Sequence, residues 1–97
     1  MQEAGVDTSG LLRSDEVMTG QGIRVVEKSG NNLIICGESS SRALRVDEVQ
    51  REILRLQPAK FFCSGFEIWE ELTLAGLKAA KACGMTTVLN ISPIPAA

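Results

Sequence analysis

Short apolar runs and one amphipathic run alternate along the second half of the chain, between Pro58 and Asn90. The run PAKFFCSGF is followed by EIWEELTLAGLKAAKACG and then by MTTVLN, with turn residues between them. A short apolar run is typical of a strand, whereas apolar residues at helical spacing indicate a helix with one buried face. The pattern therefore predicts a strand, a helix and a second strand, which is a βαβ unit with parallel strands.

The carboxyl ends of the two predicted strands are the places where we expect function. In parallel α/β sheets, ligands bind beyond these ends. Here the strands run into Gly65–Glu67 and Asn90–Pro95. These two segments are therefore the first candidates for a binding site.

The helix of this unit is expected to start near Glu67 and to end at Gly84. Glu67, Glu70 and Glu71 crowd its start and two lysines lie near its end, as the helix dipole favours. Its apolar stripe is rich in small residues, which allow close approach to a sheet. The residues of this stripe are Leu72, Ala75, Gly76, Ala79, Ala80 and Cys83.

The first half of the chain predicts a β-hairpin. Two extended runs, Thr19–Glu27 and Asn32–Cys36, flank the turn residues Lys28–Asn31. Gly20 and Gly22 in the first run have two interpretations. They mark either a bulge or close backbone approach, or simply a flexible entry to the strand.

A loop and a second helix follow the hairpin. The loop GESSSR lacks the pattern of a phosphate-binding loop. From Val46 onward, Val49, Ile53 and Leu56 recur at helical spacing, and Gln57–Pro58 ends the run. The segment before the hairpin, residues 1–14, reads as a polar loop with at most a helical stub before Gly5.

Length and composition limit the class of protein. A chain of 97 residues is one small domain or a piece of a larger one. The net charge of −2 argues against a nucleic-acid partner or a membrane-surface partner, which need a basic field. No apolar run approaches a membrane span or a signal sequence, so the expected compartment is the cytoplasm. Without any histidine, the chain offers no histidine base or metal ligand.

The three cysteines, Cys36, Cys63 and Cys83, form no CxxC pair, and their number is odd. This favours reduced thiols in or near the core over a disulfide or a metal site.

With these elements placed, the chain resembles an internal segment of the ribokinase-like (pfkB) carbohydrate kinase family. The stretches AGVDTS, TGQGIRVVEKSGNNLII and LNISPIPA are similar to that family's AGVDT, TG…V…GEN.I and LNPAPA, in the same order. The resemblance implies one partial domain over residues 1–97. Residues 19–36 would be a hairpin of the family's sugar lid, and residues 46–90 would be part of its three-layer α/β sandwich.

The resemblance also implies one substrate-binding residue. The family's sugar-contacting glutamate matches Glu67; the spacing alone favours an acidic residue at a helix start, and the resemblance favours the sugar contact instead. The chain departs from the family around it, because Gly65–Phe66 replaces a Gln-Leu pair and Ile68–Trp69 follows. In the loop GESSSRAL, Ser39 lies near the position of a family asparagine, and this loop is longer here.

Two family motifs do not occur in the 97 residues. These are the GG…N sugar motif and the GAGD motif, which carries the anion hole and the catalytic aspartate. Asp7, Asp15 and Asp47 match no such motif, so no catalytic residue, metal ligand or cofactor-binding residue is assigned. ATP and Mg²⁺ are implied for a full-length parent and not for this chain.

Three functions are compatible with the sequence. The first is a piece of an ATP-dependent kinase for ribose or a related sugar, inactive alone; a fructokinase or a nucleoside kinase is an alternative parent. The second is a noncatalytic protein that pairs with kinase subunits, or with its own copies, through the hairpin strands. The third is a Rossmann-like fragment with no kinase parent.

Overall fold

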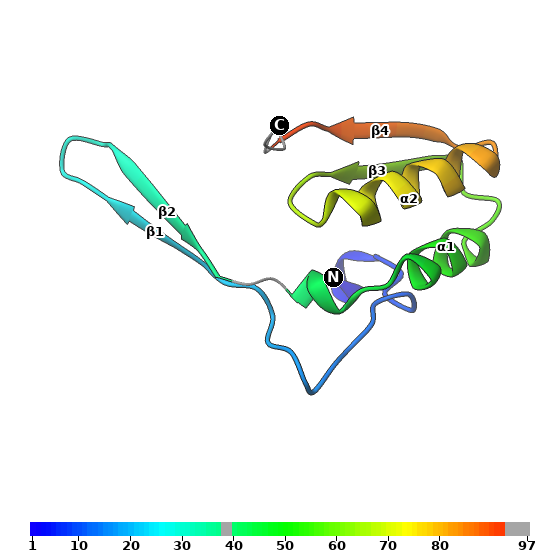
Figure 1. Cartoon of the computed structure of the whole chain (residues 1–97), viewed down its shortest axis with the longest axis horizontal. Coiled ribbons are helices and arrows are strands. Elements are labelled where there is room, and N and C mark those ends of the chain that lie inside the picture. The colour runs from blue at the N-terminus through cyan, green and yellow to red at the C-terminus, as the bar shows by residue number, and fades with distance from the viewer. Residues whose placement is uncertain (38–39, 93–97) are drawn as a thin grey trace.

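The computed structural model of the chain describes residues 1–37 and 40–92. A β-hairpin projects from an α/β unit (Figure 1). In chain order the elements are η1 (Gln2–Ala4), β1 (Gly22–Val26), β2 (Asn32–Cys36), η2 (Ser40–Ala43), α1 (Val46–Arg55), β3 (Phe61–Gly65), α2 (Glu70–Ala82) and β4 (Thr86–Asn90).

The predicted βαβ unit is confirmed. Strands β3 and β4 pair in parallel, from Phe61 opposite Thr86 to Gly65 opposite Asn90, and α2 connects them. Helix α2 contacts both strands and also α1, and Figure 1 shows the two helices one beside the other. Gly84 follows α2 with φ of 78°, a left-handed conformation that ends the helix as predicted.

The core lies between α1, α2 and the start of β4. Ile53 of α1, Ala80 of α2 and Met85 are buried together, and Val49 and Phe62 pack against them. Most of the predicted stripe of α2 is buried or half-buried, because its small residues bring the helix backbone close to neighbouring side chains.

One face of the β3–β4 sheet is covered by a helix, and the other face is exposed. Side chains alternate along a strand, so Phe62 faces α2 and is half-buried. Phe61 and Val88 lie on the opposite face and are 66% and 50% exposed. Among the described residues, no helix covers this second face. Parallel sheets are usually covered on both faces, so the described elements form one helical layer on one sheet face.

The hairpin is confirmed, with a shorter first strand than predicted. Residues pair one to one from Gly22 opposite Cys36 to Val26 opposite Asn32, so the ladder has no bulge. A side chain at Gly22 would meet no protein atom within 4 Å, so no other part of the described chain approaches the backbone at Gly22. Gly30, with φ of 93°, supplies the left-handed turn residue. Every residue of both strands is exposed.

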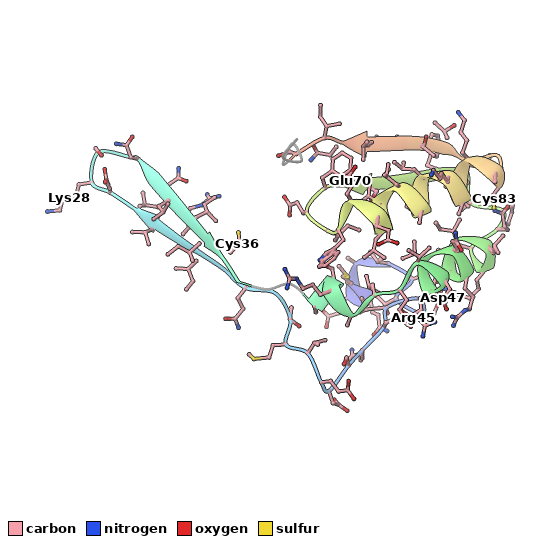
Figure 2. The ribbon with its side chains drawn as sticks, viewed as in Figure 1. Lys28, Cys36, Arg45, Asp47, Glu70 and Cys83 are labelled. Atoms are coloured by element: carbon pink, nitrogen blue, oxygen red, sulfur yellow. The ribbon has the colours of Figure 1, made fainter. Side chains whose placement is uncertain are left out.

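The cysteine prediction is wrong on location for two residues. All three cysteines are free. Cys83 is half-buried at the end of α2, but Cys36 lies on the exposed hairpin (Figure 2). Cys63 is exposed and lies on the uncovered face of β3. The two thiols are exposed because no described helix covers the hairpin strands or this face of β3.

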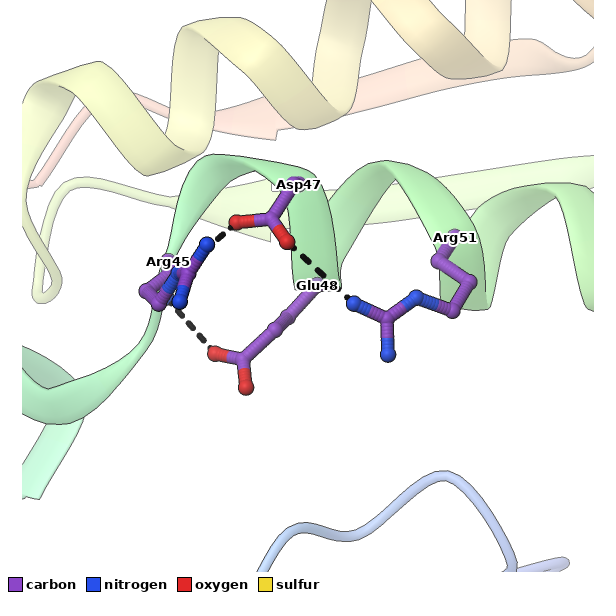
Figure 3. A network of polar contacts seen from close by, with 4 residues as sticks. All are labelled: Arg45, Asp47, Glu48 and Arg51. Atoms are coloured by element: carbon purple, nitrogen blue, oxygen red, sulfur yellow. Dashed lines mark hydrogen bonds and ion pairs between the residues drawn. The ribbon is translucent and has the colours of Figure 1, made fainter.

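Helix α1 begins in a network of charged side chains (Figure 3). The Arg45 backbone N–H donates to Glu48 Oε2 at 2.9 Å, and the Arg45 Nε donates to Asp47 Oδ1 at 2.9 Å. Arg51 Nη2 lies 3.2 Å from Asp47 Oδ2. Partial desolvation acts to raise the pKa of Asp47, but the hydrogen bond and charge of Arg45 and the charge of Arg51 outweigh it and lower that pKa.

Candidate functional site

The candidate site is the turn between β3 and α2, residues 65–69, at the carboxyl end of β3. The sequence placed the start of α2 near Glu67, and this is wrong: Trp69 is the N-cap residue and Glu70 is the first helical residue. Glu67 lies three residues earlier in the bend, and its side chain is exposed. The interpretation of Glu67 as a residue of the first helical turn therefore does not hold.

The carboxylate of Glu67 is available to a ligand. Within residues 1–37 and 40–92, no hydrogen bond or ion pair engages it. An ionised carboxylate only accepts hydrogen bonds, and hydroxyl groups are suitable donors. The Glu67 carboxylate can therefore accept hydrogen bonds from hydroxyl groups.

The beginning of this turn is held by a buried side chain of α2. Thr73 is fully buried, and its Oγ1 donates a 2.7 Å hydrogen bond to the carbonyl oxygen of Gly65. This bond satisfies the last carbonyl of β3 and fixes the distance between the strand end and the first turn of α2. The sequence interpretation missed Thr73. Its only signal is a polar residue within the apolar stripe of the helix.

The end of the turn, at Trp69, is contacted by a residue from the segment that follows the hairpin. The guanidinium carbon of Arg42, in η2, lies 5.2 Å from the centroid of the Trp69 ring. This distance is within the range of a cation–π contact. Arg42 follows the hairpin and Trp69 is the N-cap of α2, so the contact joins two segments that are far apart in the sequence. No local pattern predicts it.

The end of β4 lies beside the same turn. A β-carbon at Gly65 would lie 3.3 Å from the carbonyl oxygen of Asn90, so the two strand ends approach closely. The Ser92 N–H donates to Asn90 Oδ1 at 3.2 Å, which turns the chain after β4. The structure thus brings together the two predicted strand ends as far as Ser92. Residues 93–95 of the predicted segment, and Ser39, lie outside the described residues.

A larger apolar hollow of about 700 Å³ lies elsewhere, between the segment after η1, α1 and β3. Its lining includes Leu12, Val49, Ile53, Phe61 and Met85. Glu67 is not part of it. This hollow is therefore separate from the candidate site.

No three His, Cys, Asp or Glu side chains of residues 1–37 and 40–92 come together as metal ligands would. Neither helix in these ranges combines the length and hydrophobicity required to cross a bilayer.

Fold and site together define a mixed α/β chain, with a parallel βαβ unit, an antiparallel hairpin and an exposed carboxylate beyond a strand end. No protein-family model matches the chain. A curated relative, the ribokinase of Staphylococcus aureus (strain COL), is 29% identical over 93 residues, which are 96% of this chain and 31% of that protein.

The fold likeness extends over the whole chain. The solved structure described as "Crystal Structure of Sa239" superposes with a TM-score of 0.86 at 28% identity, covering 99% of this chain and 32% of the other. The chain therefore spans about a third of the length of the proteins it matches. It is similar to a ribokinase segment in sequence, and the α/β fold class predicted from the sequence is confirmed.

Proposed function

We propose that the chain is a lid hairpin and a βαβ portion of an ATP-dependent sugar kinase that phosphorylates ribose or a related sugar. The observation that carries this proposal is the similarity to a ribokinase over 93 residues, which are 96% of this chain. In the proposed parent, the hairpin β1–β2 covers the sugar, and β3–α2–β4 presents Glu67 to it.

Glu67 is the proposed sugar contact. It lies beyond the carboxyl end of a parallel strand, where ligands of such sheets bind, and its carboxylate is exposed and without a protein partner among the described residues. Two hydrogen bonds from neighbouring sugar hydroxyls to one carboxylate would fix the orientation of the ring. This role is binding and orientation, not proton transfer.

The phosphoryl-transfer chemistry is assigned to the rest of the parent. Transfer from ATP requires a base for the accepting hydroxyl, positive dipoles around the moving phosphoryl group, and usually Mg²⁺. No group of carboxylates gathers in the described residues to hold a metal ion. We therefore propose that the 97-residue chain alone is inactive as a kinase and contributes the sugar side only.

The test begins with the natural protein. Its intact mass is compared with that of these residues, and the longer product is assayed for ADP formation with ribose, fructose and nucleosides. We expect a longer product with ribose-dependent ADP formation, and none from the purified 97-residue chain. Turnover by that chain above a blank without enzyme would overturn the claim of inactivity. A longer product with no activity on any of the three substrates would overturn the kinase assignment.

A matched pair of variants tests Glu67. Glu67→Gln in the longer protein removes the charge and should raise the KM for the sugar, leaving kcat and the melting temperature nearly unchanged. Glu70→Gln is the control, because Glu70 lies in the first turn of α2, three residues further on. A KM that responds equally to both variants, or to neither, would remove Glu67 from the sugar site.

The exposed hairpin favours a second function, a noncatalytic partner of kinase subunits. Both strands present unpaired edges and apolar side chains, among them Leu33 at 62% exposed. Exposed strand edges recruit further strands. Under this function, the 97-residue chain would form a stable complex with a full-length kinase of the same cell and change its KM without needing Glu67.

A further inference from the structure

The turn that carries Glu67 is only five residues long, and it is held at both ends by side chains from different elements. Thr73 of α2 holds Gly65 at its beginning through a hydrogen bond. Arg42 of η2 lies over the ring of Trp69 at its end. The first of these contacts belongs to the βαβ unit itself, whereas the second comes from the segment that leaves the hairpin.

We infer that Arg42 is a positioning residue for this turn, and that it links η2 to the orientation of Glu67. The consequence for sugar binding rests on the proposed function. The order of the turn itself does not, because it rests on the contacts of Arg42 with Trp69 and of Thr73 with Gly65.

The location of η2 supports this inference. Arg42 lies six residues after Cys36, the last residue of β2. Its neighbour Ser41 is buried, so η2 is seated against the α/β unit and does not move freely with the hairpin. A contact made from η2 therefore ties Trp69 to a segment that is itself seated on the α/β unit.

The location of Trp69 gives the contact a direct effect on the helix start. The carbonyl oxygen of Trp69 accepts the backbone N–H of Leu72 at 3.0 Å and that of Thr73 at 3.1 Å. Any shift of Trp69 therefore loosens the first turn of α2, and Thr73 in that turn holds Gly65. Glu67 lies between these two fixed points. Its orientation thus depends on both.

The indole ring of Trp69 is not held in place by the core. The Trp69 side chain is 51% exposed, so the ring is not fixed by burial in the core. A guanidinium over its face adds attraction and removes part of its freedom. Without Arg42, a half-exposed ring at a helix N-cap would have little to hold it.

The test uses three variants of the full chain. Arg42→Met removes the charge and keeps a long side chain, and Arg42→Lys keeps the charge without the planar group. Arg51→Met is the control, because it removes an arginine with an ion pair on α1, away from Trp69. The chain has a single tryptophan, so its fluorescence reports the Trp69 ring without interference.

In Arg42→Met, we expect easier quenching of the tryptophan fluorescence by acrylamide. Amide hydrogen exchange at Leu72 and Thr73 should become about two- to five-fold faster, the factor that an exposed cation–π contact represents. Exchange at Cys83, whose N–H bonds to Ala79 at the far end of α2, should not change. Arg42→Lys should fall between Met and the original residue, and Arg51→Met should match the original chain. Unchanged exchange at Leu72 and Thr73, or an equal rise at Cys83, would overturn the inference.

The same variants separate this inference from the proposed function. In the longer kinase, Arg42→Met should raise the KM for the sugar with kcat retained, as Glu67→Gln should. If exchange responds to Arg42→Met but neither variant changes the KM, Arg42 positions the turn and the sugar role is rejected. If Glu67→Gln raises the KM while Arg42→Met changes neither exchange nor KM, the sugar role stands and the positioning role is rejected.

Discussion

The ring of Phe62 lies directly against Gly76. A β-carbon at Gly76 would be 2.8 Å from Phe62 Cζ and 3.3 Å from Cε1, closer than side-chain atoms normally approach. It would also lie 3.5 Å from Val49 Cγ1. The absence of a side chain at position 76 thus lets α2 settle onto β3 and lets Phe62 reach the core cluster.

Gly76→Ala tests this relationship. Alanine in a helix interior normally stabilises by about 1 kcal/mol relative to glycine, but overpacking a core costs about 1–3 kcal/mol. The clash should win, so we expect a loss of about 1 kcal/mol in the free energy of unfolding, measured by urea denaturation. In a Phe62→Leu background the ring is gone, and Gly76→Ala should then stabilise. Stabilisation by Gly76→Ala in the original chain would show that the ring moves away freely.

The stripe of small residues on α2 was predictable because it follows from helical spacing. The parallel pairing of β3 with β4 was also predictable, because two short apolar runs flank the helix in the sequence. The start of α2 was not. Glu67, Glu70 and Glu71 all favour a helix N-terminus, so the pattern places the start too early. In the structure the start is set by Trp69 and Thr73, whose contacts reach Arg42 and Gly65. A local pattern contains no such long-range contacts.

The exposed positions of β3 show a second limit of sequence reasoning. Cys63 was expected in or near the core, where free cysteines are usually found. The described elements cover one face of the sheet only, and Cys63 lies on the other face, as Phe61 does. An apolar run indicates which strand residues can be buried. Whether they are buried depends on the elements that pack against the strand. The substrate-binding role of Glu67, in contrast, was predicted from the resemblance to a family motif and not from a packing pattern.

Thr73→Val tests the hydrogen bond to Gly65. Valine has nearly the same shape but leaves the Gly65 carbonyl oxygen without its 2.7 Å donor. Loss of a buried hydrogen bond that leaves one partner unsatisfied costs about 1–3 kcal/mol, so we expect a decrease of that size in the free energy of unfolding. Thr86→Val on β4 is the control, because Thr86 is exposed and its substitution should change stability little. Equal effects of the two variants would mean that the bond contributes nothing measurable.

The network at the start of α1 predicts a pH dependence. The pKa of Asp47 is lowered from 3.8, because the hydrogen bond and charge of Arg45 and the charge of Arg51 outweigh partial desolvation. A carboxyl whose pKa is depressed on folding stabilises the fold above its unfolded pKa, and this is lost as the pH falls through the folded pKa. Asp47→Asn should therefore lower the melting temperature near neutral pH.

The difference between Asp47→Asn and the original chain should shrink as the pH falls below 3.8 and should disappear in stronger acid. It should also shrink at high salt, because the group is exposed and its interactions are screened. Thermal melts over a pH series provide the measurement. A difference that stays constant down to strong acid would assign the effect to helix propensity and not to the charge of Asp47.

The last prediction concerns association of the isolated chain. The hairpin exposes apolar side chains on both strands, and the opposed pair Ile23 and Ile35 is 59% and 53% exposed. Unpaired strand edges with apolar side chains favour pairing with further strands. We expect the chain to be marginally stable and to self-associate, which size-exclusion chromatography with light scattering would detect. A monomer with a cooperative melt above about 60 °C, high for a mesophilic domain, would refute this prediction.

Two variants locate the associating surface. Ile23→Glu with Ile35→Lys places opposite charges directly across the hairpin, which keeps strand pairing while removing the apolar contact surface. This variant should shift the chain toward monomer. Val88→Lys acts on the uncovered face of the β3–β4 sheet and should leave the association largely intact. The reverse result would assign association to the sheet face, because that face is the other large apolar surface that the described elements leave uncovered.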